Sequence, residues 1–131
     1  MVAYVDGGSR GNPGPAGYGV RIEDGHGTPV EDLHGALGIA TNNVAEYRGL
    51  IAALSWAVEH GVRSLEIRSD SQLLVRQMLG VYRVKNAGLL PLFHEARALM
   101  ARIGRVHFTH VPRELNVEAD RLANEAMDQA G

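Results

Sequence analysis

The spacing of apolar residues divides this 131-residue chain into two unequal parts. Up to about residue 38, apolar runs and alternation with period two predict β-strands separated by turns. From residue 42 onward, apolar spacings of three and four predict helices, with two short alternating segments between them. This order predicts an α/β fold in which an antiparallel hairpin trio is followed by crossover helices that bring two more strands parallel to the first.

Three strands are expected in the first part. Residues 2–6 form a nearly unbroken apolar run, as suits a central strand buried on both faces. Residues 7–17 are so rich in Gly and Pro that we expect a shaped loop there. Residues 18–23 alternate as a half-buried strand does, and an Asp-Gly turn signal predicts that residues 29–38 return antiparallel to it.

Four helices and two more strands are expected in the second part. The strongest helix signal covers residues 42–60, with Thr41 or Asn42 as its N-cap. Asp70 falls at the junction between an alternating segment and the next helix. The other expected elements are a strand at 64–69, a helix carrying Leu74, Val75 and Met78, a helix at 89–103, a strand near 106–110 and a helix from about Asn116.

Composition limits the classes of function. No segment is apolar for long enough to span a bilayer and no secretory signal is visible, so we expect a soluble, cytoplasmic protein. The absence of cysteine excludes disulfides and zinc-thiolate sites. With a formal net charge of -2, any nucleic-acid site must rest on a local positive surface. No linker or repeat is visible, so residues 1–131 are predicted to form one domain.

Four acidic residues are predicted to meet at one end of the sheet. Asp6 and Asp70 end two strands expected to be parallel, and ligand sites form at the carboxyl ends of such strands. Glu46 and Asp120 lie about one turn into helices that can face the same end. Carboxylates that converge raise one another's pKa unless a cation neutralises them, and oxygen ligands favour Mg²⁺ or Mn²⁺ over zinc. Two such ions could activate water in phosphoryl transfer.

A structural interpretation competes for each acid. Glu46, Asp70 and Asp120 lie near predicted helix starts, where the helix dipole favours negative charge. Asp6 is harder to explain in this way, because a charge that ends a strand buried on both faces needs a partner. Spacing alone therefore leaves the acidic site a hypothesis.

Several segments, in order, resemble type 1 ribonuclease H. They are YVDGGS (4–9), GNPGPAGYG (11–19), TNNVAE (41–46), SDSQ (69–72) and HVPRELNVEAD (110–120). The resemblance covers nearly the whole chain and implies the ribonuclease H-like fold, a five-stranded mixed sheet flanked by helices. It also implies an endonuclease that cuts the RNA strand of an RNA/DNA hybrid and leaves 5′-phosphate and 3′-hydroxyl ends. The acids implied to hold two Mg²⁺ ions, with Mn²⁺ as a possible substitute, are Asp6, Glu46, Asp70 and Asp120.

The resemblance also assigns residues around the acids. His110 matches the family histidine thought to help move the attacking water or release product, although a sheet-end histidine bonded to backbone would also explain it. Amide side chains and glycine backbone can contact the 2′-hydroxyl of RNA, but turn and cap chemistry would explain Asn12 and Asn42 as well. The residues implied in contacts to the RNA strand are Gly7, Gly11, Asn12, Asn42 and Gln72.

Thr41 and Asn86 resemble the family's pocket for a phosphate of the DNA strand, a contact that positions the duplex without reading its sequence. The family's pocket arginine has no clear counterpart, and Glu23 falls near its expected place. The long bacterial form carries a basic protrusion, whereas residues 79–88 here form a short link with two charges. We therefore expect weaker and more salt-sensitive hybrid binding than in the long form.

The short link resembles the archaeal and actinobacterial branch, in which the domain is sometimes fused to a phosphatase-like domain. The chain could thus be a piece of a longer protein, and we expect a monomer. Cleavage of double-stranded RNA, alone or beside hybrid cleavage, is the first alternative function. A silent nucleic-acid-binding module is the second, although such modules usually lose an acid. A related exonuclease class is disfavoured because Asp6 is followed by two glycines rather than an Asp-x-Glu pair.

Overall fold

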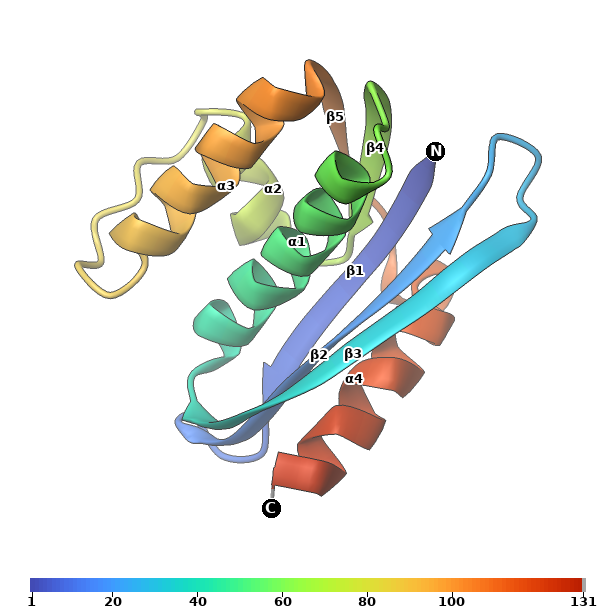
Figure 1. Ribbon diagram of the computed structural model, residues 1–131. Helices are drawn as coiled ribbons and strands as arrows, with labels where there is room; N and C mark the ends of the chain where they lie inside the picture. The colour runs from blue at the N-terminus through green and yellow to red at the C-terminus, as the bar shows by residue number, and fades with distance from the viewer. Residues whose placement is uncertain (131) are drawn as a thin grey trace.

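Five strands form one mixed sheet in the computed structural model, which describes residues 1–130 (Figure 1). β1 (Val2–Ser9), β2 (Gly14–Glu23) and β3 (Pro29–Ala40) form an antiparallel meander. β4 (Ser64–Ser69) pairs parallel with β1, and β5 (Arg105–His110) pairs parallel with β4. The resulting order is β3-β2-β1-β4-β5. The predicted sheet of three antiparallel and two further parallel strands is confirmed.

Helices cover both faces of the sheet (Figure 1). α1 (Asn42–Glu59), α2 (Gln72–Met78) and α3 (Leu90–Ile103) lie on one face, and α4 (Val117–Ala130) packs on the other face over β1, β2 and β3. A 3₁₀ turn, Arg113–Leu115, leads into α4. The predicted helices are present, with their ends shifted by about one residue. Among residues 1–130, no helix combines the length and apolar character needed to cross a membrane.

The start of α1 shows how local sequence places a site element. The hydroxyl of Thr41 accepts the N–H of Val44 over 3.2 Å, so Thr41 is the N-cap, one of the two candidates predicted. Along the helix, Tyr47, Leu50 and Leu54 are at most 1% exposed. Burial of each such side chain contributes about 1.5–3 kcal/mol, which fixes the helix on β1 and β2.

The glycine-rich stretch after residue 6 is not the long loop that was predicted. Only residues 10–13 form a turn, and the glycines on either side of it belong to β1 and β2. Close packing explains them: a Cβ on Gly7 would lie 2.3 Å from the backbone carbonyl carbon of Ala45 in α1. A Cβ on Gly17 would lie 2.6 Å from the Cβ of Ala126 in α4. The glycines therefore let helices approach the sheet closely from both faces.

Candidate active site

β1 and β4 separate at one point of the sheet, and two acids lie there. Their parallel pairing ends at the pair Val5 and Ser69. Asp6 and Asp70 are the residues that follow this last pair, at the point where the two chains diverge. Asp6 still pairs with Gly19 of β2, so it lies within β1 rather than at its end as predicted. The opening is nevertheless at the carboxyl ends of the parallel strands, where ligand sites form.

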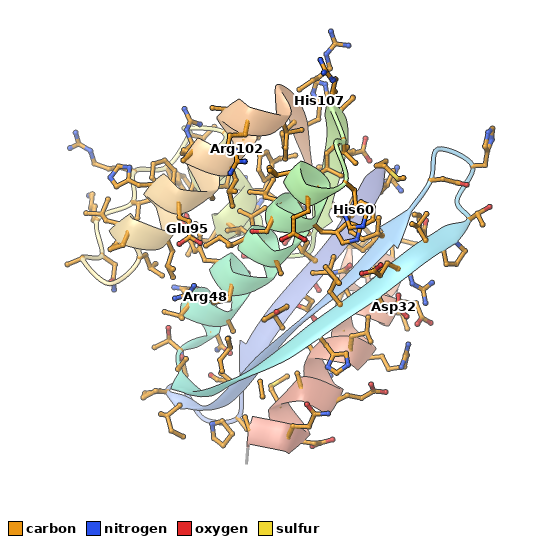
Figure 2. The ribbon with its side chains drawn as sticks, in the orientation of Figure 1. Asp32, Arg48, His60, Glu95, Arg102 and His107 are labelled. Carbon is orange, nitrogen blue, oxygen red and sulfur yellow. The ribbon has the colours of Figure 1, made fainter. Side chains whose placement is uncertain are left out.

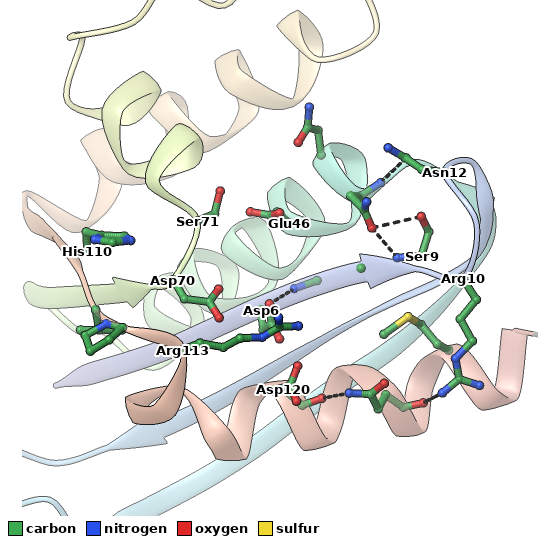
Figure 3. Close-up of a pocket in the computed structure, with 18 residues that line it drawn as sticks. Asp6, Ser9, Arg10, Asn12, Glu46, Asp70, Ser71, His110, Arg113 and Asp120 are labelled. Atoms are coloured by element: carbon green, nitrogen blue, oxygen red, sulfur yellow. Dashed lines mark hydrogen bonds between the residues drawn. The ribbon is translucent and has the colours of Figure 1, made fainter.

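Two helices bring the other acids to the same opening. Glu46 lies in the second turn of α1, and Asp120 lies in the first turn of α4 on the opposite face of the sheet. Figure 3 shows the carboxyl groups of Asp6, Glu46, Asp70 and Asp120 around a common space. All four line one cavity of about 720 Å³. The structure thus brings together the acids that the sequence singled out.

Burial and mutual repulsion raise the pKa of three of these acids. The pKa of Asp6 rises to about 8, first through burial and then through the charge of Asp70, although the N–H of Gly7 donates to Asp6 Oδ1 over 2.9 Å and opposes the rise. The pKa of Glu46 rises to about 7, chiefly through burial. Burial likewise raises the pKa of Asp70. The raised pKa values mean that these acids can ionise together only at an electrostatic cost.

The donors suit a hard divalent cation. Four carboxylates without cysteine supply the oxygen ligands that Mg²⁺ and Mn²⁺ prefer. Among residues 1–130, no three Asp, Glu or His side chains already stand close enough to hold one ion. Bringing the carboxylates closer costs free energy that the ion would supply, which fits their raised pKa values.

Arg113 is a site residue that the sequence did not single out. It opens the 3₁₀ turn before α4 and lines the cavity. Figure 3 shows its side chain reaching toward Asp6 and Asp70. Burial is the main influence on the pKa of Asp70 and raises it, while the positive charge of Arg113 is the next influence and lowers it. The available signal was a basic residue inside a segment that already supplied His110 and Asp120.

Comparison with known proteins places the chain in a family. A family model described as reverse transcriptase-like matches residues 4–126. The bifunctional protein Rv2228c of Mycobacterium tuberculosis is 50% identical over 131 residues, which are 99% of this chain and 36% of that protein. Ribonuclease HI of Halobacterium salinarum is 45% identical over 128 residues, 98% of this chain and 64% of that protein. The solved structure of LC11-RNase H1 in complex with an RNA/DNA hybrid has a TM-score of 0.93 and 46% identity, and covers 98% of this chain and 97% of that one. The chain belongs to the ribonuclease H family.

The ribonuclease H resemblance seen in the sequence is thereby confirmed, and its assigned residues divide into two groups. One group lines the cavity: Asp6, Gly7, Asn12, Asn42, Glu46, Asp70, His110 and Asp120. The other group lies outside the lining: Gly11, Thr41, Gln72 and Asn86. His110 is the last residue of β5, in register with Ser69, and its side chain is exposed at the rim. Asn86 uses its Oδ1 to accept the N–H of Gly88 over 2.7 Å, in the turn before α3.

Glu23 does not lie near the expected phosphate pocket of the ribonuclease H family. It pairs with Pro29 next to the β2–β3 hairpin turn, whereas Thr41 follows Ala40, which pairs with Gly14 at the other end of β2. Ten residues of β2 separate the two places, about 30 Å along an extended strand. The hairpin reverses the chain direction between Glu23 and Thr41, so a position chosen by its place along the sequence came to lie at the opposite end of β2.

Asn12 and Asn42 fasten the 10–13 turn to α1. Asn42 Oδ1 accepts the N–H of Ser9 over 2.8 Å and the hydroxyl of Ser9 over 3.1 Å. The N–H of Asn42 donates to Asn12 Oδ1 over 3.0 Å. Arg10 ties the same turn to α4 through an ion pair with Asp128. The turn chemistry considered for the two asparagines is therefore present, and it uses their side-chain oxygens rather than their side-chain Nδ2 groups.

Proposed function

We propose that this ribonuclease H domain is an endonuclease that hydrolyses the RNA strand of RNA/DNA hybrids with divalent metal ions. The convergence of four partly buried carboxylates where β1 and β4 part is the observation that carries this proposal. The neighbour of known structure that was solved with an RNA/DNA hybrid supports the substrate class. The proposed products are a 5′-phosphate and a 3′-hydroxyl.

The roles of the site residues follow from their positions. Asp6, Glu46, Asp70 and Asp120 would hold two Mg²⁺ ions, which would activate water and stabilise the leaving oxygen when bound. His110 stands at the rim, where its imidazole could pass a proton to or from the attacking water or the leaving group. Arg113 partly opposes the rise that burial causes in the pKa of Asp70, and it would attract a phosphate group into the cavity. These roles require that both basic groups face the scissile phosphate.

Donors for the RNA strand lie along the same cavity. The side-chain Nδ2 groups of Asn12 and Asn42 are not used in the bonds that fasten the turn, and both residues line the cavity. They are suited to donate to 2′-hydroxyl groups in the wide, shallow minor groove of a hybrid. The backbone of Gly7 and Gly11 and the side chain of Gln72 would add contacts beside them. Thr41 and Asn86 would bind a phosphate of the DNA strand further from the acids.

The positive surface needed for a polyanion is concentrated on one part of the fold. Residues 72–113 carry seven basic residues and one acidic residue, whereas the rest of the chain carries six basic and fourteen acidic residues. Figure 2 shows Arg102 on α3 and His107 on β5, while Asp32 lies on β3 at the other edge of the sheet. The basic part begins directly after Ser71, which lines the cavity. A hybrid seated on the acids would therefore extend toward α2 and α3 rather than toward β3.

Cleavage of end-labelled duplexes tests the proposal. RNA/DNA hybrid, double-stranded RNA and double-stranded DNA would be incubated with Mg²⁺, Mn²⁺ or chelator, beside Asp70→Asn. We expect metal-dependent cutting of hybrid RNA that disappears in the variant. Equal cutting of double-stranded RNA would refute the substrate preference but not the chemistry. Binding of hybrid without cutting in either metal would refute nuclease activity and favour a binding module.

A further inference from the structure

Asn116 is a buried amide in contact with the backbone beside two of the acids. Its side chain is 1% exposed, and its Nδ2 donates to the carbonyl oxygen of Val5 over 2.9 Å. Val5 immediately precedes Asp6 in β1. The backbone carbonyl of Asn116 accepts the N–H of Asp120 over 3.1 Å, which starts α4. One residue therefore joins the strand that carries Asp6 to the helix that carries Asp120.

The bond to Val5 lies where the sheet opens. Val5 is the last residue of β1 in register with β4, so no further residue of β4 is aligned to bond β1 beyond it. The Asn116 amide supplies the donor there and keeps the end of the parallel ladder satisfied.

The second polar atom of the side chain indicates that fold stability does not explain this residue. Asn116 Oδ1 is fully buried and has no hydrogen-bond partner among residues 1–130. An unpaired buried acceptor costs about 1–3 kcal/mol, so the net contribution of the side chain to stability is small even with the bond to Val5. A residue retained only to hold α4 against the sheet would not need a second buried polar atom.

We propose that Asn116 is a positioning residue that fixes Asp6 and Asp120 relative to each other and thereby sets the affinity of the cluster for a divalent cation. The expected change in kcat rests on the proposed function, but cation binding can be measured without substrate. Groups that orient metal ligands change metal affinity or activity by about 10- to 100-fold when they are removed. A purely structural role would change stability alone.

The test compares Asn116→Ser with Gln77→Leu. Serine is favoured at a helix start, but its hydroxyl is too short to reach Val5, so the start of α4 is preserved while the link is cut. Gln77 is the matched control: it is also a buried amide, 6% exposed, and its Oε1 accepts the hydroxyl of Tyr47 over 2.7 Å at the contact of α1 with α2. Unfolding in urea would establish the stability of each variant before binding and kinetics are compared.

Mg²⁺ binding would be measured by calorimetry without nucleic acid, and hybrid cleavage by kcat and KM. For Asn116→Ser we expect Mg²⁺ affinity about 10-fold weaker and kcat about 10- to 100-fold lower, with KM within about twofold. For Gln77→Leu we expect lower stability with Mg²⁺ affinity and kcat close to those of the unaltered chain. If Asn116→Ser bound Mg²⁺ normally, the inference would be wrong. If the unaltered chain bound Mg²⁺ but cut no hybrid, the proposed function would fail while the binding comparison still decided the role of Asn116.

Discussion

Replacing Asp6 by asparagine should stabilise the protein in the absence of divalent cations. The pKa of Asp6 is about 8 in the folded protein against an ordinary value of 3.8. Each pKa unit corresponds to about 1.36 kcal/mol, so at pH 7 the unfolded chain gains up to about 4 kcal/mol by ionising this group, which the folded state does not gain. Part of that difference is shared with Asp70 and Asp120, and either could take up the proton instead. Asn can still accept the N–H of Gly7, so we expect a gain of about 2–3 kcal/mol.

The pH dependence has a defined sign. Because the folded state holds the proton more tightly than the unfolded state, the unaltered chain loses this part of its stability as pH rises from about 4 to about 8. The gain from Asp6→Asn should therefore be close to zero near pH 4 and greatest near pH 8. Urea unfolding across this range, with chelator, measures it. Glu31→Gln is the control, because Glu31 is an exposed carboxylate on the edge strand β3, away from the acids.

Two results would refute the reasoning on Asp6. A loss of stability in Asp6→Asn at pH 7 would show that the carboxylate is not under electrostatic strain. A gain that stayed constant with pH would show that the strain is not caused by ionisation. Saturating Mg²⁺ should shrink the gain, because the ion would neutralise the cluster in the unaltered chain.

Three further changes test other parts of the structure. Gly7→Ala should lower the free energy of unfolding in urea by about 3 kcal/mol or more, because the new Cβ would meet the α1 backbone at 2.3 Å. Gly8→Ala is the control and should cost about 1 kcal/mol or less, because its nearest atom would lie at 3.4 Å. Equal costs would contradict the packing argument. Arg113→Ala should lower kcat about 10- to 100-fold and move the acid limb of the pH–rate profile to higher pH, because the charge that lowers the pKa of Asp70 is lost. An unchanged profile in steady-state assays would exclude this role. Replacing Arg83 and Lys85 together by serine should reduce the slope of log Kd against log salt by up to about 2 in hybrid-binding titrations, because each phosphate contact contributes about 0.9; an unchanged slope would place the duplex elsewhere.

The sequence was sufficient to predict elements with a strong period. The apolar spacing of residues 42–60 predicted α1 within one residue, because side chains such as Leu50 and Leu54 must all reach the same face. Alternation in residues 18–23 predicted β2 for the same reason. Asp6 was singled out because a charge at the end of an apolar run needs a partner, whereas Glu46, Asp70 and Asp120 were assigned through the resemblance to ribonuclease H. Their convergence then followed from the topology.

Features that depend on close approach between distant segments could not be predicted. Glycines at 7 and 17 favour a loop in sequence, but here they admit helices that lie far along the chain. The importance of Arg113 depends on where a 3₁₀ turn directs its side chain, and that of Asn116 on a bond to Val5, 111 residues away. No local pattern records such distances. Glu23 was misplaced because hairpin reversal, rather than sequence separation, sets spatial proximity.

The docking of α4 has a consequence for how the protein is made. Asp6 and Asp120 are more than a hundred residues apart, and α4 completes the site by packing into glycine positions of β2 such as Gly17 and Gly19. At about 5–20 residues per second, a ribosome exposes β1 many seconds before α4 follows. During that interval the growing chain holds at most three of the four acids. The candidate site is therefore incomplete until α4 has been synthesised and has docked on the sheet.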